Sequence, residues 1–141
     1  MSMELHVLVE DSRLPDIGQW QNAVDALGFN LKLDPTLVVR EHTGFVPCAF
    51  KGQSSGFEFD VSPASTVAQA YAEFKDQFSG RDTSANFRWG GDLNEMACSL
   101  IASVALAQVC GGLWFDPESG SCLNHSEALA QARLDLAAAR I

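Results

Sequence analysis

A long stretch that is apolar on nearly every side constrains the fold of this chain more than any other feature. Residues 93–110 have the pattern of a helix rich in Ala and Ser, and no charged residue occurs from Met96 to Cys110. A helix that is apolar all round has to be buried by the rest of the molecule. The uncharged run is shorter than the ~20 residues that cross a membrane, and polar side chains interrupt it. We therefore expect a central core helix.

Alternating side chains and capping residues indicate the other elements. Strands are expected at residues 5–9, 45–51, 56–61, 85–89, 113–115 and 121–123, and helices from Pro15 to Leu27, from Ser62-Pro63 to about Gly80 and from Asn124 onward. Short strands at 31–33 and 37–39 are weaker expectations. Together these elements predict one α+β domain over residues 1–141. It would be a two-layer or sandwich fold with one mixed, mainly antiparallel sheet of about five to six strands and about four helices.

The composition excludes several classes of function. The chain has 18 acidic and 9 basic residues, a formal charge of −9, and so lacks the clustered Lys and Arg that bind nucleic-acid backbones. With 47% hydrophobic and 19% charged residues, it has the composition of a folded chain. The first residues show no secretory leader, and the four cysteines show no C-x-x-C spacing. We expect reduced thiols in a cytoplasmic protein that contacts no membrane.

Two patterns have the spacing of chemical motifs, and for both a structural role is favoured. Residues 52–56 read GQSSG, the G-x-S-x-G of a hydrolase nucleophile elbow, but that motif needs a helix after Ser54 and a strand pattern follows here. Cys110, Cys122 and His125 lack the closely spaced second pair of a zinc site. A cysteine nucleophile needs a base beside it, and the sequence brings no histidine to a cysteine. We expect no catalytic residue, cofactor or metal.

Acidic residues are the remaining signal. Glu10 and Asp11 end the first strand, Glu58 and Asp60 share one face of a strand, and Asp116 and Glu118 lie in a turn. One interpretation is a solvated surface that maintains solubility. The sharper interpretation is an acidic face that the fold assembles and that meets a basic partner, because complementary charge speeds encounter and sets specificity. These six residues are the candidate partner-binding site.

Several short motifs are shared with a known class of bacterial proteins. They are GFVP at 44–47, SGFE at 55–58, FRWGGD at 87–92, GG at 111–112 and FDP at 115–117. Over residues 44–120 the chain resembles small proteins encoded beside secreted polymorphic toxins, which act as immunity proteins by binding the toxin. The resemblance implies a cytoplasmic, non-enzymatic inhibitor of one partner protein, and it brings no catalytic residue. The acidic charge would suit a basic toxin such as a nuclease.

Two other functions are alternatives to such a protein-binding domain. A small, hydrolase-like enzyme would use Ser54, a cysteine or paired carboxylates, and it predicts a deep cavity that gathers at least two such groups with perturbed pKa values. A homodimeric structural or scaffolding protein would place an exposed Trp20 or Trp114 at its interface. The leading expectation is the non-enzymatic protein that neutralises a basic toxin through an acidic surface.

Overall fold

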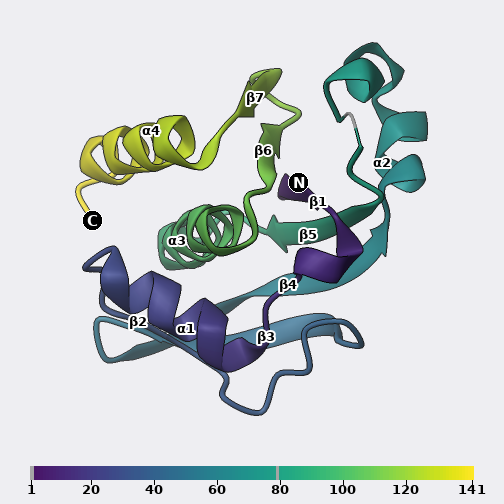
Figure 1. Ribbon diagram of the computed structural model, residues 1–141. Helices are drawn as coiled ribbons and strands as arrows, with labels where there is room; N and C mark the ends of the chain where they lie inside the picture. Colours follow the sequence, from purple (N-terminus) through teal and green to yellow (C-terminus); the bar gives the residue numbers. More distant parts are fainter. Residues whose placement is uncertain (1, 79) are drawn as a thin grey trace.

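A seven-stranded sheet forms the centre of the molecule (Figure 1). The computed structural model describes residues 2–78 and 80–141. The strands are β1 (Met3–Val9), β2 (Leu31–Leu33), β3 (Thr43–Phe50), β4 (Gln53–Pro63), β5 (Thr83–Trp89), β6 (Leu113–Asp116) and β7 (Ser121–Leu123), in the order β2-β3-β4-β5-β1-β6-β7. The expected α+β class is confirmed. The sheet has more strands than expected, and every pairing between described strands is antiparallel where a mixed sheet was expected.

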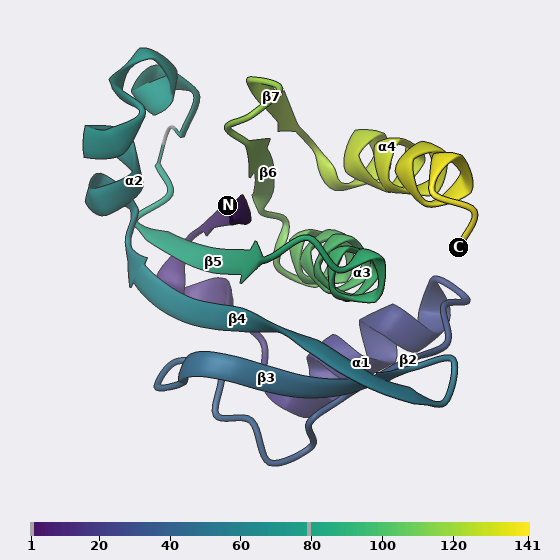
Figure 2. The same ribbon diagram turned by 180° about the vertical axis from the view of Figure 1, so that it is seen from behind.

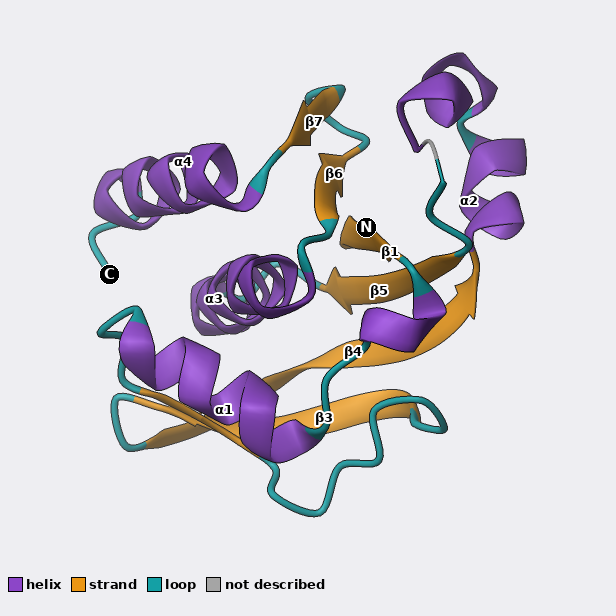
Figure 3. Cartoon of the chain, viewed as in Figure 1, coloured by secondary structure: helices purple, strands orange, loops and turns teal. Residues whose placement is uncertain are grey.

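Three helices pack on one face of the sheet, which we call the helix face (Figure 3). They are α1 (Ile17–Ala26), α3 (Leu93–Cys110) and α4 (His125–Ala138), and α3 contacts both of the others. The alternate strand residues that point to these helices are large and fully buried: Leu5, Val7, Phe57, Phe59 and Phe87. This layer is the main hydrophobic core.

The two tryptophans considered above as interface anchors belong to this core. Trp20 on α1 and Trp114 on β6 are fully buried. Each indole N–H donates a hydrogen bond to α3, Trp20 to the carbonyl of Ala102 at 2.9 Å and Trp114 to the hydroxyl of Ser103 at 3.0 Å. The expectation of an exposed tryptophan at a dimer interface is therefore wrong, because both rings fix the central helix to its neighbours.

Helix α3 is the central helix that the sequence predicts. It begins where the Asp92 side chain accepts a hydrogen bond from the backbone N–H of Glu95 at 3.0 Å, and it ends at Gly111, whose φ of 65° is left-handed. By length and composition alone this helix could cross a membrane, but 67% of it is buried inside the protein. Its apolar character on all sides is accounted for by the sheet, α1 and α4 around it.

The loop that joins β3 and β4 is shorter than the sequence indicates. Its turn consists of Lys51 and Gly52, both with positive φ (51° and 78°), and Gln53 already pairs with Phe50. Such two-residue turns match the twist of the flanking strands. Ser54 therefore lies within a strand, whereas a nucleophile elbow joins a strand to a helix.

Two expected boundaries are wrong. Strand β4 continues to Pro63 and pairs Ser62 with Ser84, so Ser62 is held in the sheet and is not the cap of a helix. Residues 37–39 form no strand: the first two are irregular and the third begins a turn. The side chain of Asp34 starts that turn region by accepting hydrogen bonds locally, which competes with strand pairing.

The other face of the sheet carries a smaller cover. Helix α2 (Ala64–Ala70) and the 3-10 helix η2 (Ala72–Phe78) lie apart from the remaining helices, beyond the ends of β4 and β5, in both views (Figure 1, Figure 2). The sequence predicts one continuous helix here, but the chain breaks at Tyr71 (φ −130°, ψ 60°), whose ring packs on Phe115. Together they bury a second cluster: Leu8, Ala64, Val67, Phe78 and Phe115.

Candidate functional site

Beyond that cover, polar side chains line the second face of the sheet. Cross-strand partners point to the same side of a sheet, so the strand register shows which residues lie together. One row joins Glu4, Arg88, Glu58 and Phe45, and the next joins His6, Asn86, Asp60 and Thr43. We call these residues the open face. They come from β1, β5, β4 and β3, so distant parts of the chain build it together.

Asn86 is the centre of a hydrogen-bond network on the open face. Its amide nitrogen donates to Asp60 Oδ1 at 2.6 Å and to the hydroxyl of Ser62 at 2.9 Å. Because a carboxylate only accepts, the atom that faces Asp60 has to be the amide nitrogen. The amide oxygen then lies on the other side, where it accepts from the Ser84 hydroxyl at 2.7 Å and meets His6 Nδ1 at 2.7 Å.

This orientation of Asn86 determines the proton position on His6. The amide oxygen is an acceptor, so the Nδ1 atom of His6 has to be the N–H donor. The other ring nitrogen, Nε2, is buried and has no hydrogen-bond partner among the described residues. It lies 3.4 Å from Glu4 Oε1. The imidazole is only 4% exposed, and its ring stacks on Phe115.

Glu4 and Tyr71 form the next link of the network. The Tyr71 hydroxyl donates a hydrogen bond to Glu4 Oε1. Partial burial acts to raise the pKa of Glu4, but the Tyr71 hydroxyl, His6 and Arg88 outweigh it and hold that pKa below its ordinary value. Burial, together with the hydrogen bond and the charge of Glu4, raises the pKa of Tyr71 to about 12. Glu4 is thus kept ionised and Tyr71 neutral.

Arg88 lies between two carboxylates of the open face. Its Nη1 atom is 3.1 Å from Asp60 Oδ2, and its Nε atom is 3.9 Å from Glu4 Oε2. The first distance is a hydrogen-bonded ion pair, whereas the second is too long for a hydrogen bond. The guanidinium is 38% exposed, so these pairs position the side chains more than they stabilise the fold.

Three hollows are linked by shared lining residues, and together we call them the acidic surface; the second of them also takes in Phe57 and, from α3, Glu95. The first, of about 530 Å³, lies between the open face and α2 and is the polar groove. The second, of about 270 Å³, shares Arg88 with the polar groove, and the third, of about 390 Å³, shares Glu4 with it. Their ionisable lining consists of five carboxylates, the single guanidinium of Arg88, the His6 imidazole and the Tyr71 phenol. The carboxylates are those of Glu4, Glu58, Asp60, Glu95 and Glu118.

Three of the six acidic residues predicted from the sequence lie on this surface. Glu58 and Asp60 belong to the open face, and Glu118 lines the third hollow. Asp116 holds its own turn instead, because its carboxylate accepts from the backbone N–H of Glu118 and from the hydroxyl of Ser119, both at 3.0 Å. Its side chain is thereby committed to local structure.

The other two predicted residues lie at the opposite end of β1. Glu10 and Asp11 follow Val9, whereas Glu4 on the open face is at the start of that strand. Asp11 pairs with Arg40 at 2.5 Å, so part of its charge is compensated. These two residues therefore line none of the three hollows of the acidic surface.

The cysteines contribute no group to the acidic surface. The hydrogen bond with Cys98 and burial raise the pKa of the Cys48 thiol, and burial raises that of Cys110 to about 11 and also raises that of Cys122. Thiols with raised pKa values are poor nucleophiles at neutral pH, whereas the hydrogen bond with Cys48 lowers the pKa of Cys98, which is fully buried. Within residues 2–78 and 80–141, no group of three His, Cys, Asp or Glu side chains is arranged to hold a metal ion, and this covers Cys110, Cys122 and His125.

The sequence analysis does not identify the central residues of the network as part of a site. Alternation puts Asn86 and Arg88 on one strand face, but nothing in the sequence indicates that β5 lies between β1 and β4. Without that order, Glu4 and His6 are ordinary polar residues of a first strand. Tyr71 is not identified for another reason: it fits the apolar stripe of the helix that the sequence predicts, so it is interpreted as a core residue.

Comparison of the chain with protein-family models, with curated proteins and with solved structures finds no match. No residue role is therefore transferred from a relative. The function has to be argued from the charges, distances and shape of the acidic surface.

Proposed function

We propose that this protein acts by binding a basic protein through the acidic surface, in the manner of an immunity protein that neutralises a toxin. The observation that carries the proposal is the lining of the three adjoining hollows, where five carboxylates accompany a single guanidinium. A surface of one sign attracts a partner of opposite sign, accelerates their encounter and disfavours other partners. The resemblance of residues 44–120 to immunity proteins favours the same role.

The pKa values of the polar groove favour binding over catalysis. A general acid or base works best when its pKa lies near the working pH. The pKa of Glu4 is lowered and that of Tyr71 is raised to about 12, so both are moved away from neutrality. Such groups are suited to hold a fixed pattern of charge and hydrogen bonds, which is what recognition of a partner requires.

The surroundings of the acidic surface also have the character of a protein interface. Phe45 is 49% exposed and lies in the same cross-strand row as Glu58 and Arg88. Aromatic and Arg side chains are enriched at protein interfaces, where they contribute much of the binding energy. A half-exposed aromatic ring beside the charged hollows would give a partner an apolar contact next to its ionic ones.

The proposal is tested with the proteins encoded beside the gene for this chain. Each is co-expressed with it, complexes are purified, and affinity is measured by calorimetry at low and high salt. We expect a basic partner whose binding weakens with salt. Glu58→Lys with Glu118→Lys should weaken binding by about tenfold or more at low salt, which corresponds to ~1.4 kcal/mol. If the partner is toxic, the same variant should lose its protection of growing cells.

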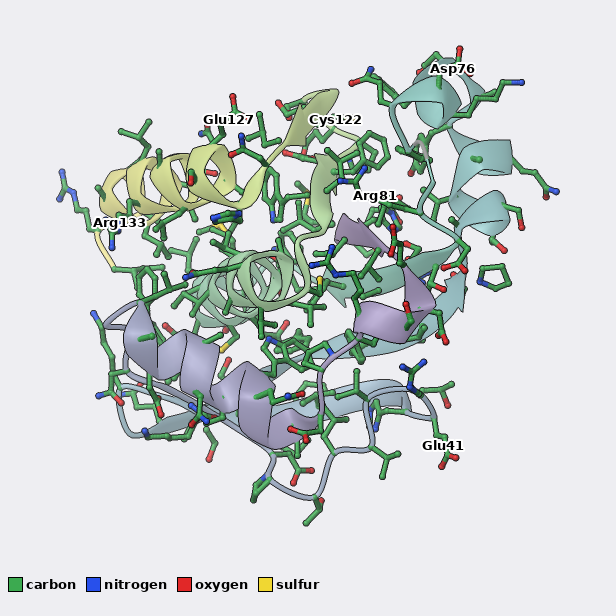
Figure 4. All side chains as sticks on the ribbon, in the orientation of Figure 1. Glu41, Asp76, Arg81, Cys122, Glu127 and Arg133 are labelled. Atoms are coloured by element: carbon green, nitrogen blue, oxygen red, sulfur yellow. The ribbon has the colours of Figure 1, made fainter. Side chains whose placement is uncertain are left out.

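A charge-matched control separates the acidic surface from net charge. Asp25→Lys with Asp135→Lys changes the charge from −9 to the same −5, but on α1 and α4. Figure 4 shows that Glu127 and Arg133, which mark α4, lie on the side of the molecule away from α2. We expect the control to bind nearly as the wild type. An equal loss of affinity in both double variants would contradict the proposal. So would the finding that none of the proteins encoded beside the gene binds.

A further inference from the structure

We propose that the polar groove holds one arginine side chain of the basic partner, with its guanidinium bound by Glu4 and His6. This inference rests on the proposed function and specifies its central contact. Three features of the groove lead to it: an acceptor without a donor, a carboxylate that is incompletely paired, and an apolar wall opposite both.

The acceptor without a donor is His6 Nε2. Asn86 accepts the Nδ1 proton, so a ring that carries a single proton presents a lone pair at Nε2. That atom is buried and has no hydrogen-bond partner among the residues that the structure describes, although buried polar atoms nearly always have one. Its nearest charged neighbour, Glu4 Oε1 at 3.4 Å, is another acceptor. A donor group with several N–H atoms, placed beside Nε2 and Glu4 Oε1, would bind both atoms at once.

The incompletely paired carboxylate is that of Glu4. Arg88 is hydrogen-bonded to Asp60, and its Nε atom stays 3.9 Å from Glu4 Oε2. The Glu4 side chain is 30% exposed in the groove, so an incoming cation can reach it. A guanidinium suits this position because it is planar, always charged and carries five N–H donors, enough for both a carboxylate and an imidazole.

The opposite wall of the groove fits the rest of an arginine side chain. Ala70 on α2 lines it and is exposed, so it offers apolar surface for the methylene groups, and Val67 beside it is buried in the second cluster. Tyr71, at the end of α2, also lines the groove, and its hydroxyl donates to Glu4 Oε1, the oxygen that lies 3.4 Å from Nε2. The bound guanidinium replaces that hydroxyl on Glu4 Oε1, so the occupied groove has a displaced Tyr71 side chain.

The test uses acetyl-argininamide as the probe, with acetyl-citrullinamide as its neutral isostere. The protein carries labelled tyrosine and histidine, and because Tyr71 is the only tyrosine its ring gives an unambiguous nuclear magnetic resonance signal. We expect acetyl-argininamide to bind with a Kd on the order of millimolar, typical of so small a ligand. Binding should shift the Tyr71 ring and the His6 Nε2 signals, and acetyl-citrullinamide should bind at least ~10-fold more weakly, as loss of a charged hydrogen bond predicts.

Variants locate the contact. Glu4→Gln should raise the Kd of acetyl-argininamide by ~10-fold or more. The matched change Glu58→Gln, on the same face but outside the groove, should leave that Kd within about twofold of the wild-type value. Equal binding of both probes, an unaffected Glu4→Gln variant, or a protonated Nε2 in the free protein at neutral pH would overturn the proposal. Should Glu4→Gln fail to fold, the wild-type shifts with the two probes decide alone.

Failure of this inference and failure of the proposed function give different results. If the acidic surface binds a basic partner but not a guanidinium in the groove, Glu58→Lys with Glu118→Lys still weakens the complex while acetyl-argininamide shifts no Tyr71 signal. If the proposed function is wrong, no basic protein encoded beside the gene binds, whether or not acetyl-argininamide binds in the groove.

Discussion

At the scale of single residues, Tyr71 reports directly on the network of the open face because it is the only tyrosine in the chain. Burial and the contact with Glu4 raise its pKa to about 12. The folded state therefore favours the neutral phenol. This stabilisation is fully present below the ordinary tyrosine pKa of ~10 and is lost as pH rises through about 12. An ultraviolet titration of the phenolate should have its midpoint near 12.

Two amide variants separate the contact from general burial. Glu4→Gln removes the charge that opposes ionisation of Tyr71, so the midpoint should move down toward ~10. Glu58→Gln lies on the same face without touching Tyr71 and should leave the midpoint in place. A wild-type midpoint at the ordinary value, or the same midpoint in Glu4→Gln, would mean that the hydroxyl does not bind Glu4 in solution.

Side-chain alternation predicts the correct strand face for some of these residues, but it does not predict their contacts across the sheet. It predicts that Glu58 and Asp60 point the same way, and the register confirms that they do. It does not join His6 to Asn86, which are 80 residues apart in sequence. That contact depends on β1 pairing with β5 at one particular register, and such long-range pairing leaves no local signal.

At the scale of elements, the β3–β4 hairpin depends on Gly56. Its φ is 153°, and a Cβ there would lie 2.5 Å from a ring carbon of Phe45 and against the carbonyl oxygen of Val46. Since the Val46 carbonyl belongs to the paired backbone of β3 and cannot move freely, we expect Gly56→Ala to lower the free energy of unfolding by about 2 kcal/mol. Denaturant unfolding measures this change.

Gly90 supplies the matched control for that substitution. A Cβ at Gly90 meets nothing within 4 Å, and its φ is not in the left-handed region. Gly90→Ala should therefore change the free energy of unfolding by less than ~0.5 kcal/mol. Equal effects of the two substitutions would show that the Phe45 ring does not lie over Gly56.

Elements with local signals are predicted well, and those set by distant contacts are not. The helix at 93–110 has a capping aspartate before it and a left-handed glycine after it, so its bounds follow from the sequence. The break at Tyr71 has no such signal, because it is coupled to a ring contact with Phe115 and a hydrogen bond to Glu4. The strand residue Ser62 reads as a helix cap for the same reason: its partner Ser84 lies far along the chain.

At the scale of the whole molecule, the two faces of the sheet have different tasks. The helix face buries the large apolar side chains against α1, α3 and α4 and supplies most of the hydrophobic core. Stability is therefore obtained on one side, and the other side is free to carry charges that a core would exclude. Concentrating five carboxylates around a single guanidinium costs electrostatic repulsion, which a basic partner would relieve.

The same charge distribution predicts the state of the free protein. Among the described residues, the exposed large apolar side chains are Val38, Phe45, Leu93, Val109 and Leu134, and the two on α3, Leu93 and Val109, lie near its opposite ends. Two copies, each with a charge of −9, also repel one another at low salt. We expect sedimentation to give the monomer mass of 15.2 kDa at both low and high salt. A doubling of the mass at high salt would reveal a self-association face that repulsion conceals, and it would favour the homodimeric alternative over a charged binding surface.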